Sequence, residues 1–332
     1  MELFGLVGIT IMLVLAFEFV NGFHDSANSI ATIVATRVLT PVSAVAMAAF
    51  FNFIGIYAGQ KVAETMGTGI IDSDLTAEYG AVLILSAVLG AVAWDLITWW
   101  FGIPTSSSHA LVGGLIGAGG AVAGLNAVVW HGTMKTAAFI VISPAIGLIA
   151  AFVLTALVMR IAYKVSRTVV NKWFRKLQLV SSAFYSFTHG SNDAQKGVGI
   201  IATLLVIETG AAWHAELWMM VACGSALALG TFFGGWRIVK TMASRITKLD
   251  PYQGFCAETG AAMMLYSTAK LGIPVSTTHT ISGAIMGVGA TKRLSAVRWG
   301  VGKKIVIAWI LTIPASATIA GLLFLGFNAL GI

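Results

Sequence analysis

The sequence predicts an all-α membrane protein of two inverted-topology repeats, with broken or re-entrant helices that meet at a site near the middle of the bilayer. Three observations predict this fold: an apolar composition, an internal duplication, and opposite charges in equivalent loops. Of the 332 residues, 58% are hydrophobic and 10% are charged, whereas a soluble domain carries roughly 25% charged residues. Such a chain is expected to be embedded in a lipid bilayer.

Apolar segments of the length that crosses a bilayer core, about 20 residues, form two series of six. Their approximate bounds are 3–20, 22–38, 41–60, 80–101, 103–124 and 136–161, then 177–188, 190–207, 217–236, 254–271, 273–290 and 305–330. A strongly basic stretch separates the two series, and short Lys/Arg-rich loops stay in the cytoplasm. We therefore expect a first repeat over 1–161, a cytoplasmic linker over 162–176 and a second repeat over 177–332.

Two motifs of the first series return in the second. Gly102-Ile-Pro-Thr-Ser-Ser-Ser-His109 returns 170 residues later as Gly272-Ile-Pro-Val-Ser-Thr-Thr-His279. The segment from Phe19 to Ser29 aligns with the segment from Phe187 to Gly197, which pairs Asp25 with Asp193 and Asn28 with Lys196. Polar motifs duplicated in an apolar chain are typical of transporters whose site lies between two repeats.

Equivalent loops of the two series carry opposite charges. The acidic residues of loop 61–79 are Glu64, Asp72, Asp74 and Glu78, and the basic residues of loop 237–250 are Arg237, Lys240, Arg245 and Lys248. By the positive-inside rule these loops lie on opposite sides of the membrane. The repeats are therefore inverted, each makes an odd number of net crossings, and both termini are expected outside the cytoplasm.

This parity requires one net crossing from residues 1–38, which are long for a single plain helix. Polar residues stand in the middle of that segment, namely Asn21, His24, Asp25 and Asn28. Irregular backbone at membrane depth is tolerated where it lines a protein cavity. We therefore expect a broken or re-entrant helix here, and another in 177–207 around His189, Asn192 and Asp193.

The duplicated aspartates are candidate binding residues, because an ionised carboxylate at membrane depth is costly unless it is paired. One Asp alone could equally lie in an interfacial loop or cap a helix. The occurrence of Asp25 and Asp193 in both halves, each within a polar motif, favours a shared site.

The duplicated hydroxyl clusters are candidates for binding an anion. Ser106, Ser107 and Ser108 follow Pro104, and Ser276, Thr277 and Thr278 follow Pro274 in the same way. A hydroxyl-capped helix start presents free N–H groups and a positive dipole end to an anion. Ordinary capping with small-residue helix packing is the alternative, but the duplication favours two helix starts that surround one tetrahedral oxyanion.

The segments Gly22–Ser29 and His189–Lys196, with the two Gly-Ile-Pro-x-Ser-x-x-His motifs, resemble the PiT family of inorganic phosphate transporters, most closely the bacterial low-affinity Pit permeases. The resemblance covers essentially the whole chain. It implies secondary-active import of inorganic phosphate across the plasma membrane of a prokaryote, driven by a cation gradient, by a multi-pass protein that forms a homodimer. It also implies that Asp25 and Asn28 lie with Ser106–Ser108, and that Asn192 and Asp193 lie with Ser276–Thr278.

Sodium-coupled members of this family carry Asn-Asp-x-x-Asn in both halves, whereas this chain has His24 in place of the first Asn and Lys196 in place of the last. An Asn offers a carbonyl oxygen to a cation, but a Lys offers only donors. We therefore expect Lys196 to contact Asp193 or phosphate. We also expect coupling to protons, or entry of a neutral metal–phosphate complex; sodium coupling is the alternative.

No resident cofactor is expected, only a co-transported cation. Its candidate carriers, besides Asp25 and Asp193, are Glu18, His24, His109 and His279. Each of the last two could equally be a packing histidine. Asp95 and Glu258 are further buried acidic candidates without an acidic partner in the other repeat.

Other functions fit the sequence less well. A sulfate permease of the same family would not need two carboxylates, because sulfate brings no hydrogen-bond donor. An enzyme that used Ser108 and His109 would need adjacent helical residues to face each other, which they do not. A phosphate-binding loop of the Gly-x-x-x-x-Gly-Lys-Ser/Thr type is absent, which argues against an ATP-driven pump. A passive channel remains an alternative.

Neither nucleic acid nor a disulfide is expected. The net charge of +7 comes from loops that topology explains, so no nucleic-acid partner is expected. Cys223 and Cys256 lie in apolar segments, where they are interpreted as small buried residues.

Overall fold

The computed structural model describes residues 2–72 and 79–331, and in these ranges the chain is helical without a β-strand. The helices are α1 (Glu2–Ala35), α2 (Pro41–Gly55), α3 (Lys61–Thr68), α5 (Gly80–Phe101), α6 (Ser107–Ala123), α7 (Trp130–Ile161), α8 (Arg167–Thr209), α9 (Leu217–Phe233), α10 (Trp236–Lys240), α11 (Pro251–Lys270), α12 (Thr277–Ala290) and α13 (Trp299–Ala329). Short 3₁₀ turns at Ile56–Ala58, Gly124–Ala127 and Leu294–Ala296 and a π-helical turn at Thr241–Arg245 complete the described part.

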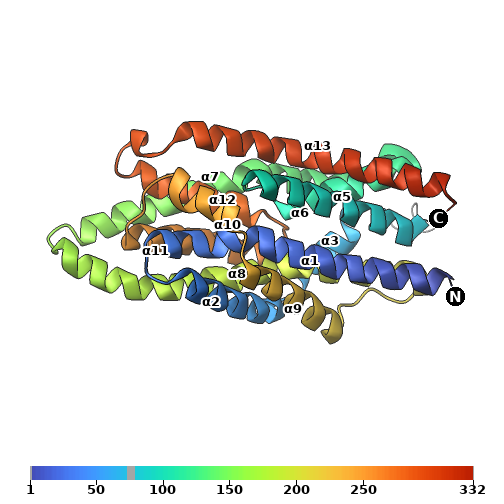
Figure 1. The fold of residues 1–332 in the computed structure, drawn as a ribbon, viewed down its shortest axis with the longest axis horizontal. Coiled ribbons are helices and arrows are strands. Elements are labelled where there is room, and N and C mark those ends of the chain that lie inside the picture. The colour runs from blue at the N-terminus through green and yellow to red at the C-terminus, as the bar shows by residue number, and fades with distance from the viewer. Residues whose placement is uncertain (1, 73–78, 332) are drawn as a thin grey trace.

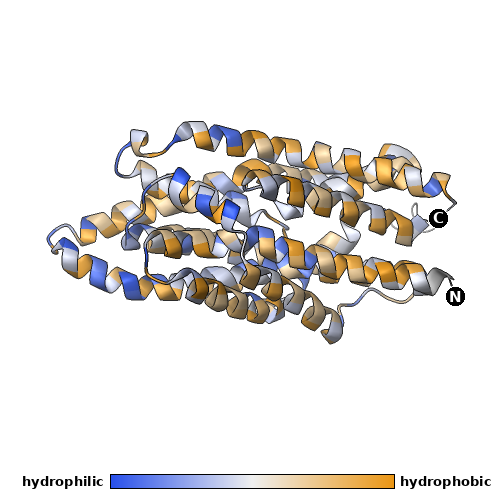
Figure 2. Ribbon diagram, viewed as in Figure 1, coloured by the Kyte–Doolittle hydropathy of each residue, from blue (hydrophilic) through white to orange (hydrophobic). Residues whose placement is uncertain are grey.

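The molecule is a multi-pass membrane protein. Within the described residues, six helices are long and apolar enough to cross a bilayer, or seven if α9 and the segment Trp236–Arg245, bent by 56°, form one span. Large apolar side chains on α7 and α13 point outward, for example Val141 (71% exposed) and Leu322 (66% exposed). Figure 2 shows hydrophobic residues along these helices and polar residues at the end opposite the termini, where α8 begins.

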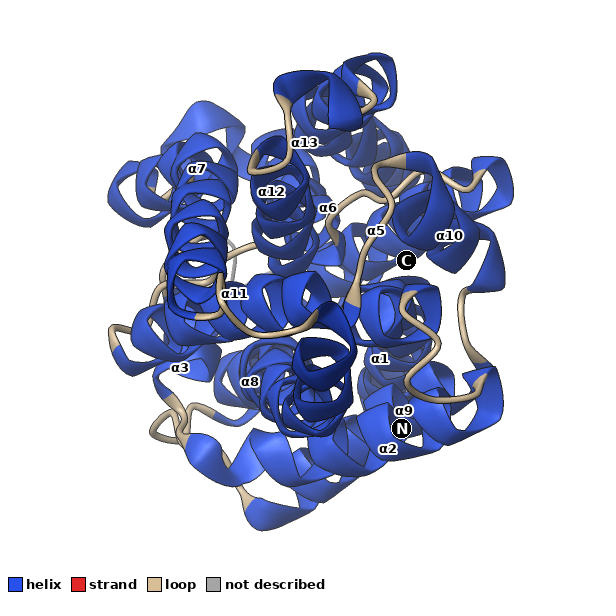
Figure 3. Ribbon diagram, turned by 90° about the vertical axis from the view of Figure 1, so that its left-hand side faces the viewer, coloured by secondary structure: helices blue, strands red, loops and turns tan. Residues whose placement is uncertain are grey.

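The two halves are related as inverted repeats. Equivalent helices run in opposite directions along the long axis, α1 against α8 and α7 against α13, and both termini lie at one end (Figure 1). In each half two successive helices form a hairpin, α5 with α6 in the first half and α11 with α12 in the second. The last long helix of each half packs on the hairpin of the other half, α7 on α12 and α13 on α6. Seen along that axis, α7, α13 and α2 are peripheral, while α1, α8 and α12 are more central (Figure 3).

The predicted position of the helix breaks is wrong. Both polar segments lie inside continuous helices, since α1 has 34 residues and α8 has 43. A buried polar side chain does not require unwinding when it finds partners on neighbouring helices, because the helical backbone satisfies its own hydrogen bonds. The breaks lie instead between α5 and α6 and between α11 and α12, where a glycine with φ of +66° or +65° and a proline follow in sequence.

Paired glycines explain why the two hairpins can pack so tightly on the opposite repeat. A Cβ atom on Gly117 of α6 would lie 2.0 Å from the carbonyl oxygen of Ala317 on α13, and one on Gly287 of α12 would lie 2.2 Å from that of Leu148 on α7. Backbones approach this closely only where side chains are missing, as in small-residue interfaces of membrane helices.

Two smaller predictions, on the linker and on the cysteines, can also be compared with the structure. Only residues 162–166 lie between helices, because the rest of the predicted linker forms the first turns of α8. Cys223 and Cys256 are buried free cysteines, which confirms their interpretation. Asp74 and Glu78 of the acidic loop lie outside the described residues.

Candidate substrate site

The site is built around the tips of the two hairpins, residues 102–109 and 272–279. The two tips have the same local structure. Ser106 caps the start of α6 and accepts a hydrogen bond from the His109 amide at 3.3 Å, and Ser276 caps the start of α12 and accepts one from the His279 amide at 3.1 Å. The predicted hydroxyl caps are therefore present in both repeats. The tips also touch each other, since Ser108 Oγ donates to the Val275 carbonyl at 3.4 Å.

Each tip is tied to a short helix by an equivalent threonine. Thr241 Oγ1 donates to the Gly102 carbonyl at 2.8 Å, and Thr65 Oγ1 donates to the Gly272 carbonyl at 2.7 Å. Because Gly102 and Gly272 have left-handed φ angles, which side-chain-free residues adopt at low cost, the turns bring their carbonyls within reach of these hydroxyls. The pseudo-symmetry thus extends to single hydrogen bonds.

Two buried carboxylates from opposite repeats converge between the tips. Ligand atoms of Asp25, Asp193 and His189 all lie within 4.8 Å of one another, which confirms the predicted proximity of the two aspartates. Ser107 Oγ donates to Asp25 Oδ2 at 3.2 Å. Thr278 Oγ1, from the other repeat, lies 3.4 Å from Asp25 Oδ1.

The residues that depart from the sodium-coupled pattern both bind these carboxylates. His24 Nδ1 donates to Asp25 Oδ1 at 2.7 Å, and Lys196 Nζ donates to Asp193 Oδ1 at 2.5 Å. His189 Nε2 lies 3.1 Å from Asp193 Oδ2. Buried polar groups persist where they are paired and hydrogen-bonded, so these nitrogen groups stabilise both carboxyl side chains away from water.

The second repeat contributes hydroxyls to residues of both halves. Thr277 Oγ1 donates to Asp193 Oδ2 at 3.2 Å. Asn28 Nδ2 donates to Thr278 Oγ1 at 2.8 Å and to Thr277 Oγ1 at 3.3 Å. Asn28 was expected beside Ser106–Ser108 of its own repeat, but its side chain binds the hydroxyls of the other repeat instead. The predicted half-sites therefore form one mixed site.

Asn192 is placed differently from the expectation that it lies with Ser276–Thr278. Its side-chain nitrogen donates to the carbonyls of Thr188 at 3.0 Å and Leu265 at 3.2 Å. Asn192 therefore links α8 to α11 by a hydrogen bond. Its Oδ1 is buried and has no hydrogen-bond partner among the described residues.

The remaining coupling candidates fall into separate surroundings. Glu18 joins the repeats, because its Oε1 accepts from the Gly197 amide at 2.8 Å. The rings of His109 and His279 lie 4.8 Å apart, and His279 stacks on Trp309 at 3.8 Å. These ring contacts are those of packing histidines.

The two other acidic candidates differ from each other. Glu258 accepts from Thr32 at 2.6 Å, Gln178 at 3.0 Å and Ser181 at 2.5 Å, in a network of its own. Neither carboxylate oxygen of buried Asp95 has a hydrogen-bond partner among the described residues.

The sequence interpretation left two contributors, Asn21 and His189, out of the site. Ser107 Oγ donates to Asn21 Oδ1 at 2.5 Å, and His189 Nδ1 is bonded to Asn52 Oδ1 at 3.1 Å while its other nitrogen faces Asp193. The alignment that pairs Asp25 with Asp193 also pairs Asn21 with His189. The pairing of Asn21 with His189 was therefore the sequence signal that could have identified both residues as members of the site.

The arrangement suits a tetrahedral oxyanion that carries a proton. The hydroxyls of Ser107, Thr277 and Thr278 and the Lys196 ammonium can donate to anionic oxygens, and the two helix starts add positive dipole ends. Asp25 and Asp193 can accept a hydrogen bond from a protonated oxygen. Asp25, His189 and Asp193 could also hold a divalent cation that travels with the anion.

Comparisons with known proteins find relatives over nearly the whole chain. The model of the "Phosphate transporter family" matches residues 21–320. The chain is 54% identical over 322 residues to a "Probable low-affinity inorganic phosphate transporter" of Rhizobium meliloti (strain 1021), covering 96% of this chain and 95% of the relative. A protein of the same description from Bacillus subtilis (strain 168) is 42% identical over 325 residues, covering 96% and 97%.

A solved structure has the same fold. "The sodium-dependent phosphate transporter" superposes with a TM-score of 0.90 at 26% identity, covering 98% of this chain and 99% of that one. The fold, the two converging hairpins and the sequence relatives lead to one assignment: the chain belongs to the phosphate transporter family.

Proposed function

We propose that this protein imports inorganic phosphate by secondary-active transport coupled to protons, with phosphate held between Asp25 and Asp193. The observation that carries the proposal is the convergence of these buried carboxylates from inverted repeats within 4.8 Å. Two acceptors suit phosphate, which keeps a donor hydroxyl near neutral pH, better than sulfate, which has none. Both termini are proposed to be extracytoplasmic, because they lie opposite the basic start of α8 (Figure 1).

The contacts of His24 and Lys196 support protons over sodium. Each carboxylate already binds a nitrogen group, at 2.7 Å for Asp25 and 2.5 Å for Asp193. A sodium ion needs oxygen ligands, and an ammonium group supplies none. His24 Nε2 is also bonded to Thr98 Oγ1 at 3.2 Å, so both ring nitrogens of a side chain type that carries protons in many proteins are engaged at the site.

Sodium coupling is the second candidate, because the structural neighbour is sodium-dependent. A third option keeps the site and changes the cargo: Asp25, His189 and Asp193 would hold a divalent ion that enters as a neutral complex with phosphate. These candidates differ in the gradient or ion that drives uptake.

We expect purified protein in liposomes to accumulate labelled phosphate when an inward proton gradient is imposed, and not when a sodium gradient is imposed at clamped pH. Uptake is measured with and without magnesium, and with a chelator, to detect co-transport of a metal. Lys196→Asn, which restores the family's last Asn, is expected to acquire sodium stimulation. Accumulation by wild-type protein from a sodium gradient alone would contradict proton coupling.

A further inference from the structure

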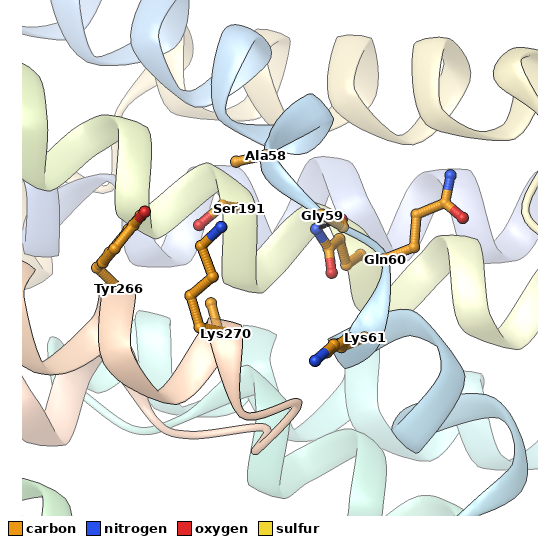
Figure 4. Close-up of a pocket in the computed structure, with 9 residues that line it drawn as sticks. Ala58, Gly59, Gln60, Lys61, Ser191, Tyr266 and Lys270 are labelled. Carbon is orange, nitrogen blue, oxygen red and sulfur yellow. Dashed lines mark hydrogen bonds between the residues drawn. The ribbon is translucent and has the colours of Figure 1, made fainter.

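A polar cavity of about 200 Å³ lies against α8, between the end of α11 and the segment that joins α2 to α3. Its polar lining comprises Gln60, Lys61, Ser191, Gln195, Tyr266 and Lys270. A single buried water needs roughly 15 Å³ in this measure, so the cavity has room for a tetrahedral oxyanion. Figure 4 shows the Lys270 side chain extending from the end of α11 across the cavity toward α8.

The cavity is positively charged. Lys61 and Lys270 line it, and no lining residue is acidic. Among the described residues, no carboxylate lies within ion-pair distance of either ammonium group; Lys270 Nζ lies 5.5 Å from the centre of the Tyr266 ring. Charged residues in membrane proteins that are not paired face water-filled pathways. Two such lysines therefore leave a cationic recess available to an anion.

The cavity borders the elements that build the substrate site. Ser191 and Gln195 stand on the same turns of α8 as Asp193 and Lys196, and the Gln195 side chain donates to the Gly59 carbonyl at the cavity. The Thr65 hydroxyl, one turn after Lys61, holds the Gly272 carbonyl of the hairpin that carries the site hydroxyls. Helix α8 and this hairpin thus contribute residues to both the cavity and the site.

The equivalent place in the other repeat has a cation that contacts an aromatic residue. Thr65 corresponds to Thr241 by their matching bonds to the hairpin tips, so Lys61 corresponds to Arg237; the hairpin motifs match Lys270 with Trp100. Arg237 donates to the Trp100 carbonyl at 2.7 Å, and its guanidinium lies 4.2 Å from the centre of the Trp100 ring. The repeats therefore differ: one face has two lysines in a cavity without a carboxylate partner among the described residues, and the other has a cation stacked on an aromatic ring.

We propose that the cavity is an anion-binding vestibule, in which Lys61 and Lys270 capture phosphate before it enters the site between Asp25 and Asp193. This inference rests on the proposed function and adds a second, shallower binding position. A free phosphate anion is the ligand that the two cavity lysines favour, because a neutral metal–phosphate complex gains little from their charge.

The test measures initial rates of labelled phosphate uptake in proteoliposomes against phosphate concentration. Lys61→Gln with Lys270→Gln is expected to raise KM about 3- to 20-fold, with kcat changed less than about twofold, since lost attraction weakens capture but leaves the inner site intact. Wild-type KM should rise with ionic strength, and that of the double variant should not. Lys135→Gln, which removes an exposed lysine outside the cavity, is the matched control; Lys61→Arg with Lys270→Arg should keep the wild-type KM.

Lys270→Cys allows the charge in the cavity to be changed by chemical modification of the folded protein. The native cysteines are buried, so the reagents should modify the introduced thiol. Modification with an aminoethyl thiosulfonate restores a positive charge and should lower KM toward the wild-type value, whereas a sulfonatoethyl reagent should raise it further. Equal KM values after both reagents, or a double variant with wild-type KM, overturn the vestibule. A salt-sensitive KM that appears only with magnesium present also overturns it, because the captured species is then a complex. Wild-type protein that takes up no phosphate under any gradient would instead defeat the proposed function.

Discussion

Asp25→Asn is expected to reduce phosphate uptake about 10- to 100-fold. The substitution keeps the side-chain shape but removes the charge that accepts from His24, Ser107 and Thr278. Hydrogen bonds to charged groups contribute about 1.5–3 kcal/mol, and about 1.4 kcal/mol corresponds to a factor of ten. An amide also turns two donors toward the site, where an anion's hydroxyl needs an acceptor.

Asp193→Asn is expected to have an effect at least as large, because it also leaves the Lys196 ammonium buried without its carboxylate. Removing one partner of a buried ion pair costs roughly 3–5 kcal/mol, so this variant is examined for folding by size-exclusion chromatography before uptake is measured. Asp250→Asn is the control: it changes an acidic cap of α11 whose ion pairs are with Arg167 and Lys292 rather than with site residues, and Asn is an equally good cap. If the Asp25→Asn variant took up phosphate at the wild-type rate, phosphate transport would not depend on the Asp25 carboxylate.

Gly117→Ala is expected to destabilise the protein by about 1–3 kcal/mol, as overpacking of a close interface does. Its new Cβ would meet backbone atoms of Ala317, with the carbonyl oxygen 2.0 Å away and the carbonyl carbon 2.6 Å away. Backbone atoms cannot rotate aside, so α6 and α13 must separate. Because α6 begins at the site hydroxyls, uptake should fall together with stability.

Gly120→Ala in the same helix provides the matched control. Apart from its chain neighbours and the nearby backbone of α6, no atom of the described residues lies within 4 Å of a Cβ placed there, and replacing a helical glycine with alanine stabilises by about 0.4–1 kcal/mol. Thermal unfolding of the two variants in detergent should therefore shift in opposite directions. Equal midpoints would mean that the repeats are not held by the close contact at Gly117.

The duplication in the sequence predicted the convergence of the two aspartates, but not the partners of every polar residue around them. Asp25 with Asp193, and Ser107 with Thr277, share positions in aligned motifs, and inverted repeats place aligned motifs around one pseudo-twofold axis. The caps at Ser106 and Ser276 followed from local rules, because a hydroxyl after a proline turn is a common helix start.

The course of the main chain through the site could not be predicted in the same way. The polar residues of α1 and α8 suggested unwound backbone, but whether a polar side chain sits in a helix depends on partners from distant segments. Asn28 finds its partners on Thr277 and Thr278, and Glu18 finds the Gly197 amide. These contacts cannot be predicted from hydropathy and motif spacing. The different surroundings of Lys61 and Arg237, which occupy equivalent positions, could not be predicted for the same reason.

The most direct test of the account is the position of a bound oxyanion in an experimental structure. Arsenate, a tetrahedral analogue of phosphate, can be located by its anomalous scattering in crystals of the wild-type protein. The account predicts a peak between the repeats, with oxygens within about 2.5–3.0 Å of Asp25 and Asp193 carboxylates and of hydroxyls from both hairpins. A principal peak that contacts residues of one repeat alone, or that lies away from both aspartates, would contradict it.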